Sequence, residues 1–284
     1  MRGRRIGIVG HPGFLDTLLD LARAMPEVEL VPGSGLDLAR ARLPTLAIPP
    51  LAVSLKMADE MIACFRATET LLVVEQRYRF HPAWAYLQSE LSGGKLGDLL
   101  YAHLRCRDPR HHPDPQLAFL HLTSMQLDLL HWLWPQRSLI AEPSRADVGN
   151  DPQLAWIYVH FADGALGLLE MGWNLPGARR AGNHQLPDMD LHLVGTDGVA
   201  EVLGSSWSLR LVTGEGWAFP DATDQLLLRR QLEHVLGWVD QDRGDHPSVG
   251  ESRSALEVAL AAWARCSRLP MRTQKGSRRR GDER

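Results

Sequence analysis

Hydrophobic residues in the first 80 positions alternate between short strand-like runs and stripes at helical spacing. Residues 5–9 form an apolar run, and apolar positions at helical spacing follow in 14–25. Further strands are predicted at 28–31, 46–48 and 70–74, and the last is a continuous apolar run typical of a strand buried on both faces. Ser54 is a suitable N-terminal cap for a helix between it and the strand at 70–74. The pattern predicts an α/β unit that persists to about residue 76.

After residue 97 the pattern changes to a succession of strands joined by short turns. Strands are predicted at 99–105, 138–148, 154–161, 165–173, 189–194, 199–203 and 207–212. A long helix at 115–134 interrupts this antiparallel meander, and two helices close the chain at 224–240 and 252–268. We therefore predict an α/β plus α+β fold. It comprises a shortened Rossmann-like domain (1–80), an α+β domain with a large, mostly antiparallel open sheet (81–271) and a basic, disordered tail (272–284).

Composition narrows the class of protein further. The 284 residues are 44% hydrophobic and 23% charged, as in globular proteins, and the net charge of -3 does not favour nucleic-acid binding. No apolar run approaches the roughly 18 residues of a membrane span, and no signal-peptide core follows the start. We expect a cytoplasmic protein with no membrane partner. Cys64, Cys106 and Cys266 are widely spaced and expected to be reduced, and no metal site is predicted.

The turn after the first strand lies where a dinucleotide-binding turn belongs. Gly7, Gly10 and Gly13 surround it, and amides at the start of the following helix are suited to a pyrophosphate. Counted from Gly10, the fingerprint GxGxxG needs glycines where this chain has Pro12 and Leu15. Proline lacks the amide that would hold phosphate. The turn is therefore either a remodelled cofactor site or a vestigial one that binds no nucleotide.

The long helix carries two candidates for proton transfer. His121 and Asp128 share one helical face, but they are two turns apart, about 10 Å along the axis, which is too far for a direct hydrogen bond. They could line one pocket as an acid and a base. The alternative is a buried histidine and a paired aspartate.

Two strand ends offer ligand-binding groups. Arg77 and Arg79 follow a buried strand at the edge where α/β proteins bind ligands, and they could hold a carboxylate or sugar hydroxyls. The alternative is that both pair with nearby acids. Trp173 and Asn174 end another strand with an aromatic ring and an amide, which suits a sugar but equally suits a simple turn.

Seven segments in order, from residue 4 to about 271, resemble the glucose-fructose oxidoreductase and inositol dehydrogenase (Gfo/Idh/MocA) family. They are IGIVG (6–10), PLA (50–52), QRYRFHP (76–82), GKLGD (94–98), LDLLHWL (127–133), GTDG (195–198) and HPS (246–248). The resemblance implies a Rossmann domain, a second domain whose open sheet often forms subunit contacts, and NAD(P)-dependent oxidation or reduction of sugars and cyclitols.

The chain departs from the pattern that this resemblance implies. Pro49 stands where the family has the lysine of a Glu-Lys-Pro-Leu motif, and the family's catalytic aspartate and histidine fall on His121 and Met125. The second strand ends at Val31 and Pro32 without the acid that binds ribose. Only forty residues separate the glycine turn from the proline motif, so a strand–helix section is predicted to be missing.

Three functional hypotheses remain open at this point. The chain is an NAD- or NADP-dependent oxidoreductase acting on a CH–OH group of a sugar or polyol, with degraded motifs and a site remodelled around His121. Alternatively, it is a non-catalytic ligand-binding or assembly subunit without a cofactor, or a cofactor-independent lyase or isomerase that uses His121 as its base. In each case we expect a small sugar- or polyol-like ligand and a homodimer or higher homo-oligomer formed through the exposed sheet face.

Overall fold

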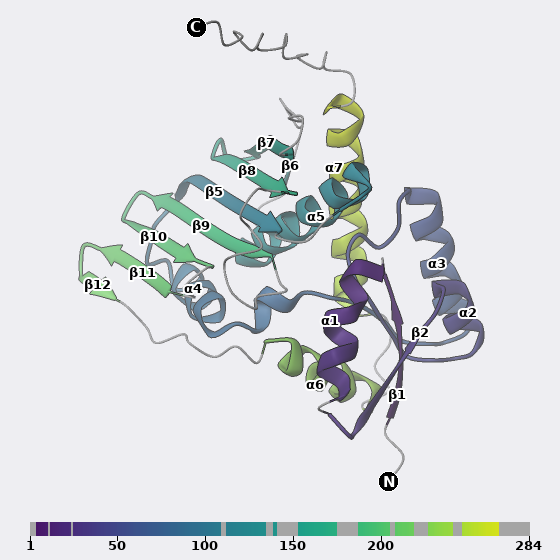
Figure 1. Cartoon of the computed structure of the whole chain (residues 1–284). Helices are drawn as coiled ribbons and strands as arrows, with labels where there is room; N and C mark the ends of the chain where they lie inside the picture. Colours follow the sequence, from purple (N-terminus) through teal and green to yellow (C-terminus); the bar gives the residue numbers. More distant parts are fainter. Residues whose placement is uncertain are drawn as a thin grey trace, which may run out of the picture.

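The computed structural model describes residues 4–10, 12–23, 25–108, 112–134, 139–140, 153–174, 187–204, 208–218, 227–240 and 246–266. These residues form one sheet of four strands and one of eight, connected by helices (Figure 1). The predicted basic tail at 272–284 lies outside the described residues. No helix in the described part of the chain is long and apolar enough to cross a membrane.

The four-stranded sheet is the shortened Rossmann-like unit that the sequence predicts. Its strands are β1 (Arg4–Val9), β2 (Val28–Pro32), β3 (Thr45–Ala47) and β4 (Leu72–Val74), all parallel, in the order β2-β1-β3-β4. Helix α1 (Pro12–Arg23) joins β1 to β2. From β2 the chain passes through the six-residue helix α2 (Gly35–Arg40) directly to β3, on the other side of β1. Within the described residues this confirms the missing strand–helix section.

Helices cover both faces of this sheet. Alternate strand residues such as Leu46 and Val73 pack with α1 on one face, in an apolar cluster that also contains Leu232 and Val235 of α6 (Leu227–Asp240). The opposite face packs against α2 and α3 (Leu55–Ala67). Helix α6 therefore lies beside α1, far from it in sequence (Figure 1). The division of the chain at residue 80 stays a prediction, since a helix from the second predicted domain completes the core of the first.

The eight-stranded sheet has the order β12-β11-β10-β9-β5-β8-β7-β6. Only β5 and β8 pair in parallel, and the other neighbours are antiparallel, which confirms the predicted mostly antiparallel sheet. The strands are β5 (Leu99–Asp108), β6 (Leu139–Ile140), β7 (Gln153–Phe161), β8 (Leu166–Trp173), β9 (Asp188–Gly195), β10 (Gly198–Leu203), β11 (Ser208–Thr213) and β12 (Gly216–Ala218). Of the strand predicted at 138–148, the described residues contain only β6. The sequence pattern did not predict strand β12, which follows β11 through a short turn and pairs with it as a hairpin.

One face of this sheet is covered by α4 (Pro82–Ser92) and the long helix α5 (Pro115–Leu133), which in turn packs against α7 (Pro247–Cys266) (Figure 1). On the other face, Tyr158 and Leu166 are 45% and 49% exposed. Charged pairs cross the same face, including Arg105 with Asp190 at 2.5 Å. This outer face is therefore mixed, with apolar residues on β7 and β8 and ion pairs farther along the sheet.

Two helices begin with the same His-Pro arrangement. His246 Nδ1 accepts a hydrogen bond from the amide of Ser248 at 3.2 Å, and His81 Nδ1 accepts one from Ala83 at 3.2 Å. Proline in the first helical position has no N–H group that would need an acceptor. The imidazole accepts from the amide of the next residue, as a serine or aspartate side chain usually does at a helix start. Helix α7 consequently begins at Pro247, five residues before the predicted start.

Candidate functional site

The carboxyl ends of β1 and β3 form the switch point of the parallel sheet, because the chain leaves β1 toward β2 on one side and returns to β3 on the other. Open α/β sheets bind ligands in this crevice. Gly10 packs closely there, since a Cβ on it would lie 2.9 Å from Ile48 Cβ. A Cβ on Gly7 would lie 2.4 Å from Thr45 Oγ1. The close approach of β3 and of Ile48, which follows it, therefore requires both glycines, whereas Gly13 lies in α1 and its surroundings are outside the described side chains.

His121 lies at this switch point. It is fully buried on α5, and its Nδ1 is 2.5 Å from the carbonyl oxygen of Pro49, in the segment that follows β3. A carbonyl only accepts hydrogen bonds, so Nδ1 of His121 carries a proton and donates it in the hydrogen bond to Pro49. Asp114 holds the start of this helix, because its carboxylate accepts from the amides of Gln116 and Leu117.

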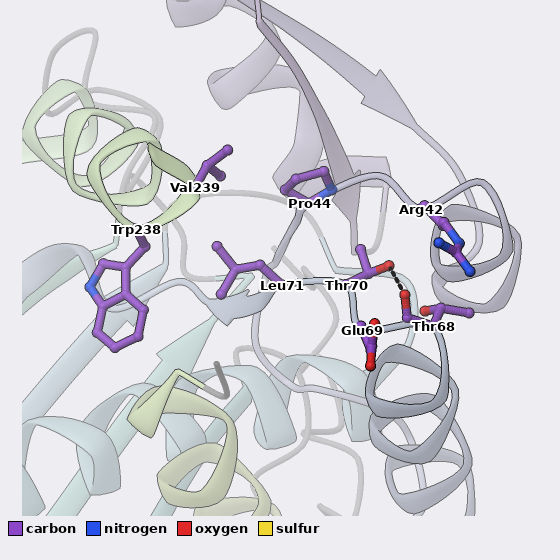
Figure 2. A pocket seen from close by; sticks show the side chains of 8 residues that line it. All are labelled: Arg42, Pro44, Thr68, Glu69, Thr70, Leu71, Trp238 and Val239. Carbon is purple, nitrogen blue, oxygen red and sulfur yellow. Dashed lines mark hydrogen bonds between the residues drawn. The ribbon is translucent and has the colours of Figure 1, made fainter. Parts of the chain in front are cut away.

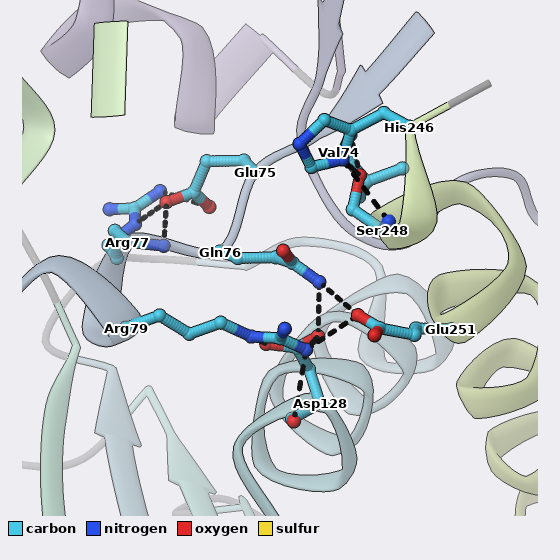
Figure 3. Close-up of polar contacts among 9 residues, drawn as sticks. All are labelled: Val74, Glu75, Gln76, Arg77, Arg79, Asp128, His246, Ser248 and Glu251. Atoms are coloured by element: carbon cyan, nitrogen blue, oxygen red, sulfur yellow. Dashed lines mark hydrogen bonds and ion pairs between the residues drawn. The ribbon is translucent and has the colours of Figure 1, made fainter. Parts of the chain in front are cut away.

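Asp128, seven residues along α5, belongs to a separate polar cluster with Gln76, Arg79 and Glu251 (Figure 3). Arg79 Nη2 donates to Asp128 Oδ1 at 2.6 Å and to Glu251 Oε2 at 2.7 Å, and Gln76 Nε2 donates to the same two oxygens at 2.7 and 2.8 Å. Burial raises the pKa of Asp128, although Arg79 opposes it. Burial acts to raise the pKa of Glu251, but Arg79, Gln76 and His131 together oppose it and the pKa is lowered. The cluster joins three elements: the turn η1 (Arg77–Phe80), α5 and α7.

Arg77 forms a buried ion pair with Glu75, and both side chains are at most 2% exposed. Arg77 Nη2 donates to Glu75 Oε2 at 2.9 Å, and Nε donates to the other carboxylate oxygen. Burial acts to lower the pKa of Arg77, but Glu75, with smaller contributions from Tyr78 and Asp108, opposes it and the pKa is raised. In this structure both Arg77 and Arg79 therefore pair with nearby acids, which is the alternative to ligand binding that the sequence left open.

Trp173 and Asn174 are also engaged within the protein. The indole is fully buried, so it offers no exposed surface for stacking in this structure. Asn174 has a φ of 56°, and its side chain accepts from the amide of His112 at 2.8 Å and donates to the carbonyl of His112 at 3.1 Å. His112 Nε2 lies 2.9 Å from the fully buried Asp108 carboxylate. Sequence reasoning missed the roles of Asp108 and His112, which lie at the end of β5 and just before α5.

The predicted residues thus lie around the carboxyl ends of the parallel strands, but in four separate groups. Each group is defined by its contacts: His121 with Pro49, Asp128 with Arg79, Arg77 with Glu75, and Asn174 with His112. Their contact with a ligand stays a prediction. Among the described residues, no group of three or more His, Cys, Asp or Glu side chains is placed to hold a metal ion.

Known proteins resemble the chain in structure. No family profile and no curated protein matches it by sequence. An oxidoreductase from Agrobacterium radiobacter, solved with NAD+, L-tartaric acid and magnesium, superposes with a TM-score of 0.72 at 14% identity, covering 93% of this chain and 96% of that one. Levoglucosan dehydrogenase with NADH and L-sorbose gives a TM-score of 0.71 at 13% identity over 94% and 97%. A protein assigned as a myo-inositol dehydrogenase from Sinorhizobium meliloti gives 0.66 at 16% over 93% and 97%.

At these identities the likeness establishes the fold. Both sheets are included, because each comparison covers more than nine-tenths of either chain. The chain therefore has the fold of the glucose-fructose oxidoreductase and inositol dehydrogenase family, as its sequence motifs predict.

Proposed function

We propose that this chain is a relative of the NAD(P)-dependent sugar and cyclitol dehydrogenases in which the cofactor and catalytic motifs have been replaced. The observation that carries the proposal is the 2.5 Å contact between His121 Nδ1 and the Pro49 carbonyl. The motif resemblance assigns these two positions to a catalytic aspartate and a catalytic lysine. Here the aspartate position holds the buried imidazole of His121, and the lysine position holds Pro49, whose side chain has no donor. The imidazole and the Pro49 carbonyl form a hydrogen bond with each other.

The position that the resemblance assigns to the proton-transferring histidine supports the same proposal. It is Met125, which is 5% exposed and whose thioether has no proton to exchange. Hydride transfer from an alcohol needs a base beside the carbinol, and neither Pro49 nor Met125 can supply one. Dehydrogenase chemistry at the usual atoms is therefore not expected.

The residues present do not fit a dinucleotide. Helix α1 begins at Pro12, so its first position offers no amide to a phosphate. Beyond β2, the first polar side chains satisfy one another: Ser34 Oγ donates to Asp37 Oδ2 at 2.6 Å, and Arg40 contacts the same carboxylate at 3.4 Å. At the end of β2, the described residues Val31, Pro32 and Gly33 include no acid that could bind a ribose. We expect NAD(P) to bind weakly.

Calorimetric titration with NAD+, NADH, NADP+ and NADPH tests this part of the proposal. We expect dissociation constants above about 1 mM for all four, corresponding to less than about 4 kcal/mol of binding free energy. Levoglucosan dehydrogenase, which was solved with NADH, is the positive control in the same buffer. A submillimolar dissociation constant for any of the four would contradict the proposal.

A second candidate function has its own observation. Because Nδ1 of His121 faces a carbonyl, the Nε2 lone pair is the basic one, and the same carbonyl would stabilise the imidazolium formed on protonation. This arrangement suits a general base in a cofactor-independent isomerase or lyase. Such a base would take a proton from the carbon next to a sugar carbonyl, leaving the electron pair as an enolate.

Deuterium exchange distinguishes the two candidates. Ketoses, aldoses and sugar acids are incubated with the protein in D2O, and loss of the proton signal next to the carbonyl is followed by NMR. Exchange that is absent in His121→Asn but retained in Met125→Leu would favour the isomerase or lyase. No exchange with any compound would leave the non-catalytic ligand-binding or assembly subunit as the better description.

Assembly through the outer face of the eight-stranded sheet is also part of the proposal. Tyr158 and Leu166 expose large apolar surfaces on that face. We expect a dimer or larger oligomer in sedimentation velocity at micromolar concentration, and dissociation in Leu166→Lys. Met57→Lys on α3, where Met57 is 52% exposed, is the control for adding a charge elsewhere. A wild-type monomer would refute this part.

A further inference from the structure

A cavity of about 200 Å³ lies at the edge of the parallel sheet opposite the candidate site (Figure 2). Pro44 and Leu71 line it, and they directly precede β3 and β4, so the cavity is at the amino ends of the strands. Trp238, in the last turn of α6, closes one side. Because the switch-point crevice is at the carboxyl ends, this cavity is independent of the proposed function.

Two residues in the cavity wall have an unusual backbone conformation. Arg42 and Glu69 have φ values of 53° and 52°, and they make up two of the three described non-glycine residues with positive φ. Each is the first residue beyond the cap of a helix, Arg42 after α2 and Glu69 after α3. Glycine is the usual residue there, because a Cβ is strained in this conformation. The chain instead places opposite charges at both positions.

Neither of these charged groups has an ion-pair or hydrogen-bond partner among the described side chains. Both residues are exposed, and their side chains lie at the same end of the cavity as Thr68 and Thr70 (Figure 2). The two threonine hydroxyls donate to backbone carbonyls, at 3.0 Å to Cys64 and at 3.2 Å to Thr68, so their oxygen atoms remain available as acceptors. This end therefore offers a cation, an anion and two neutral acceptors.

The opposite end of the cavity is apolar. Leu71, Pro44 and the Trp238 indole lie there (Figure 2). Helices α3 and α6 both end at the cavity, and the partial negative charge of a helix C-terminus favours a positively charged group. The volume is below the roughly 300 to 1,000 Å³ of sites for drug-sized ligands, so it suits a small ligand.

We propose that this cavity binds a free α-amino acid with an apolar side chain. The carboxylate would pair with Arg42, and the ammonium group would contact Glu69 and the threonine oxygens. The side chain would lie against Leu71 and Trp238. A zwitterion of this kind matches both unpartnered charges at once, which explains why two positions suited to glycine hold charged residues.

The indole N–H signal of Trp238 is the local reporter for a test by NMR. It is identified among the nine tryptophans by its loss in Trp238→Phe. Titration with L-phenylalanine and L-leucine is expected to shift this signal saturably, with a dissociation constant below about 5 mM for at least one of them. N-acetyl-L-phenylalanine, which lacks the ammonium group, and L-phenylalaninamide, which lacks the carboxylate, are expected to bind at least about tenfold more weakly.

Two glycine variants separate binding from folding. Arg42→Gly and Glu69→Gly place the preferred residue at a positive φ, so the melting temperature should stay the same or rise, while amino-acid binding should weaken at least about tenfold. Arg40→Gln is the matched control, because Arg40 ends the same helix but pairs with Asp37 at 3.4 Å. No saturable shift of the Trp238 signal up to about 20 mM, or unchanged binding in both glycine variants, would overturn the proposal.

Discussion

Acid should destabilise this protein through His246, the capping residue of α7. The ring is 8% exposed, its Nδ1 accepts from the amide of Ser248, and its Nε2 lies 3.1 Å from Nε2 of His234. Burial, His234 and Arg79 lower the pKa of His246 from 6.5 to about 4, with Glu251 opposing them. In the unfolded chain the imidazole regains its ordinary pKa and binds a proton at a higher pH.

The sign and size of the effect follow from that difference. Because the folded-state pKa is the lower one, the unfolded state binds more protons between about pH 6.5 and pH 4, so the contribution is complete above this window and is lost as the pH falls through it. The full difference corresponds to about 3.4 kcal/mol at about 1.36 kcal/mol per pKa unit. Partial solvation of the group and the incomplete titration at pH 4.5 reduce this to about 2 kcal/mol between pH 7 and pH 4.5.

Urea unfolding of the wild type and of His246→Asn at both pH values measures this contribution. Asparagine keeps an acceptor for the helix cap but does not titrate, so the variant isolates the imidazole from the carboxylates that also titrate in acid. We expect the wild type to lose about 2 kcal/mol more than the variant over this pH interval. Parallel losses in the two proteins would refute the reasoning.

Two further predictions concern the buried polar groups around the candidate site. Arg79→Met leaves Asp128 and Glu251 facing each other without their shared cation. The free energy of unfolding, measured by urea denaturation, should therefore fall by about 3 to 5 kcal/mol. A loss below about 1 kcal/mol would mean that the cluster is open to solvent. His121→Ala removes a fully buried ring and its contact with Pro49, and should cost about 2 to 4 kcal/mol. A melting temperature unchanged by that substitution would contradict the full burial of the His121 ring.

The elements followed from local patterns, because strands and helices leave a periodic record in sequence. The continuous apolar run before Glu75 predicted β4, and the long apolar periodicity predicted α5 to within one residue of its end. Helix α7 was harder, because His246 caps it with an imidazole and histidine is not among the residues usually expected at that position. Local pattern therefore predicts most elements but not every helix start.

The partners of the site residues could not be predicted in the same way. Arg79 pairs with Asp128 and Glu251, which are 49 and 172 residues away, so only the folded chain brings the three together. The sequence left open whether this arginine held a ligand or an acid for that reason. The cavity lined by Arg42 and Trp238 was missed entirely, since its walls come from segments that show no shared motif.

The position of α6 against the four-stranded sheet has a consequence for biosynthesis. Leu232 and Val235 complete the apolar cluster around Ile6 and Ile8, so one face of the first sheet lacks part of its cover until the ribosome has made the last quarter of the chain. At about 5 to 20 residues per second, roughly 8 to 30 s pass between residue 80 and residue 235. During this interval we expect the nascent amino-terminal segment to expose part of this apolar face, which its distant helix covers only after it emerges.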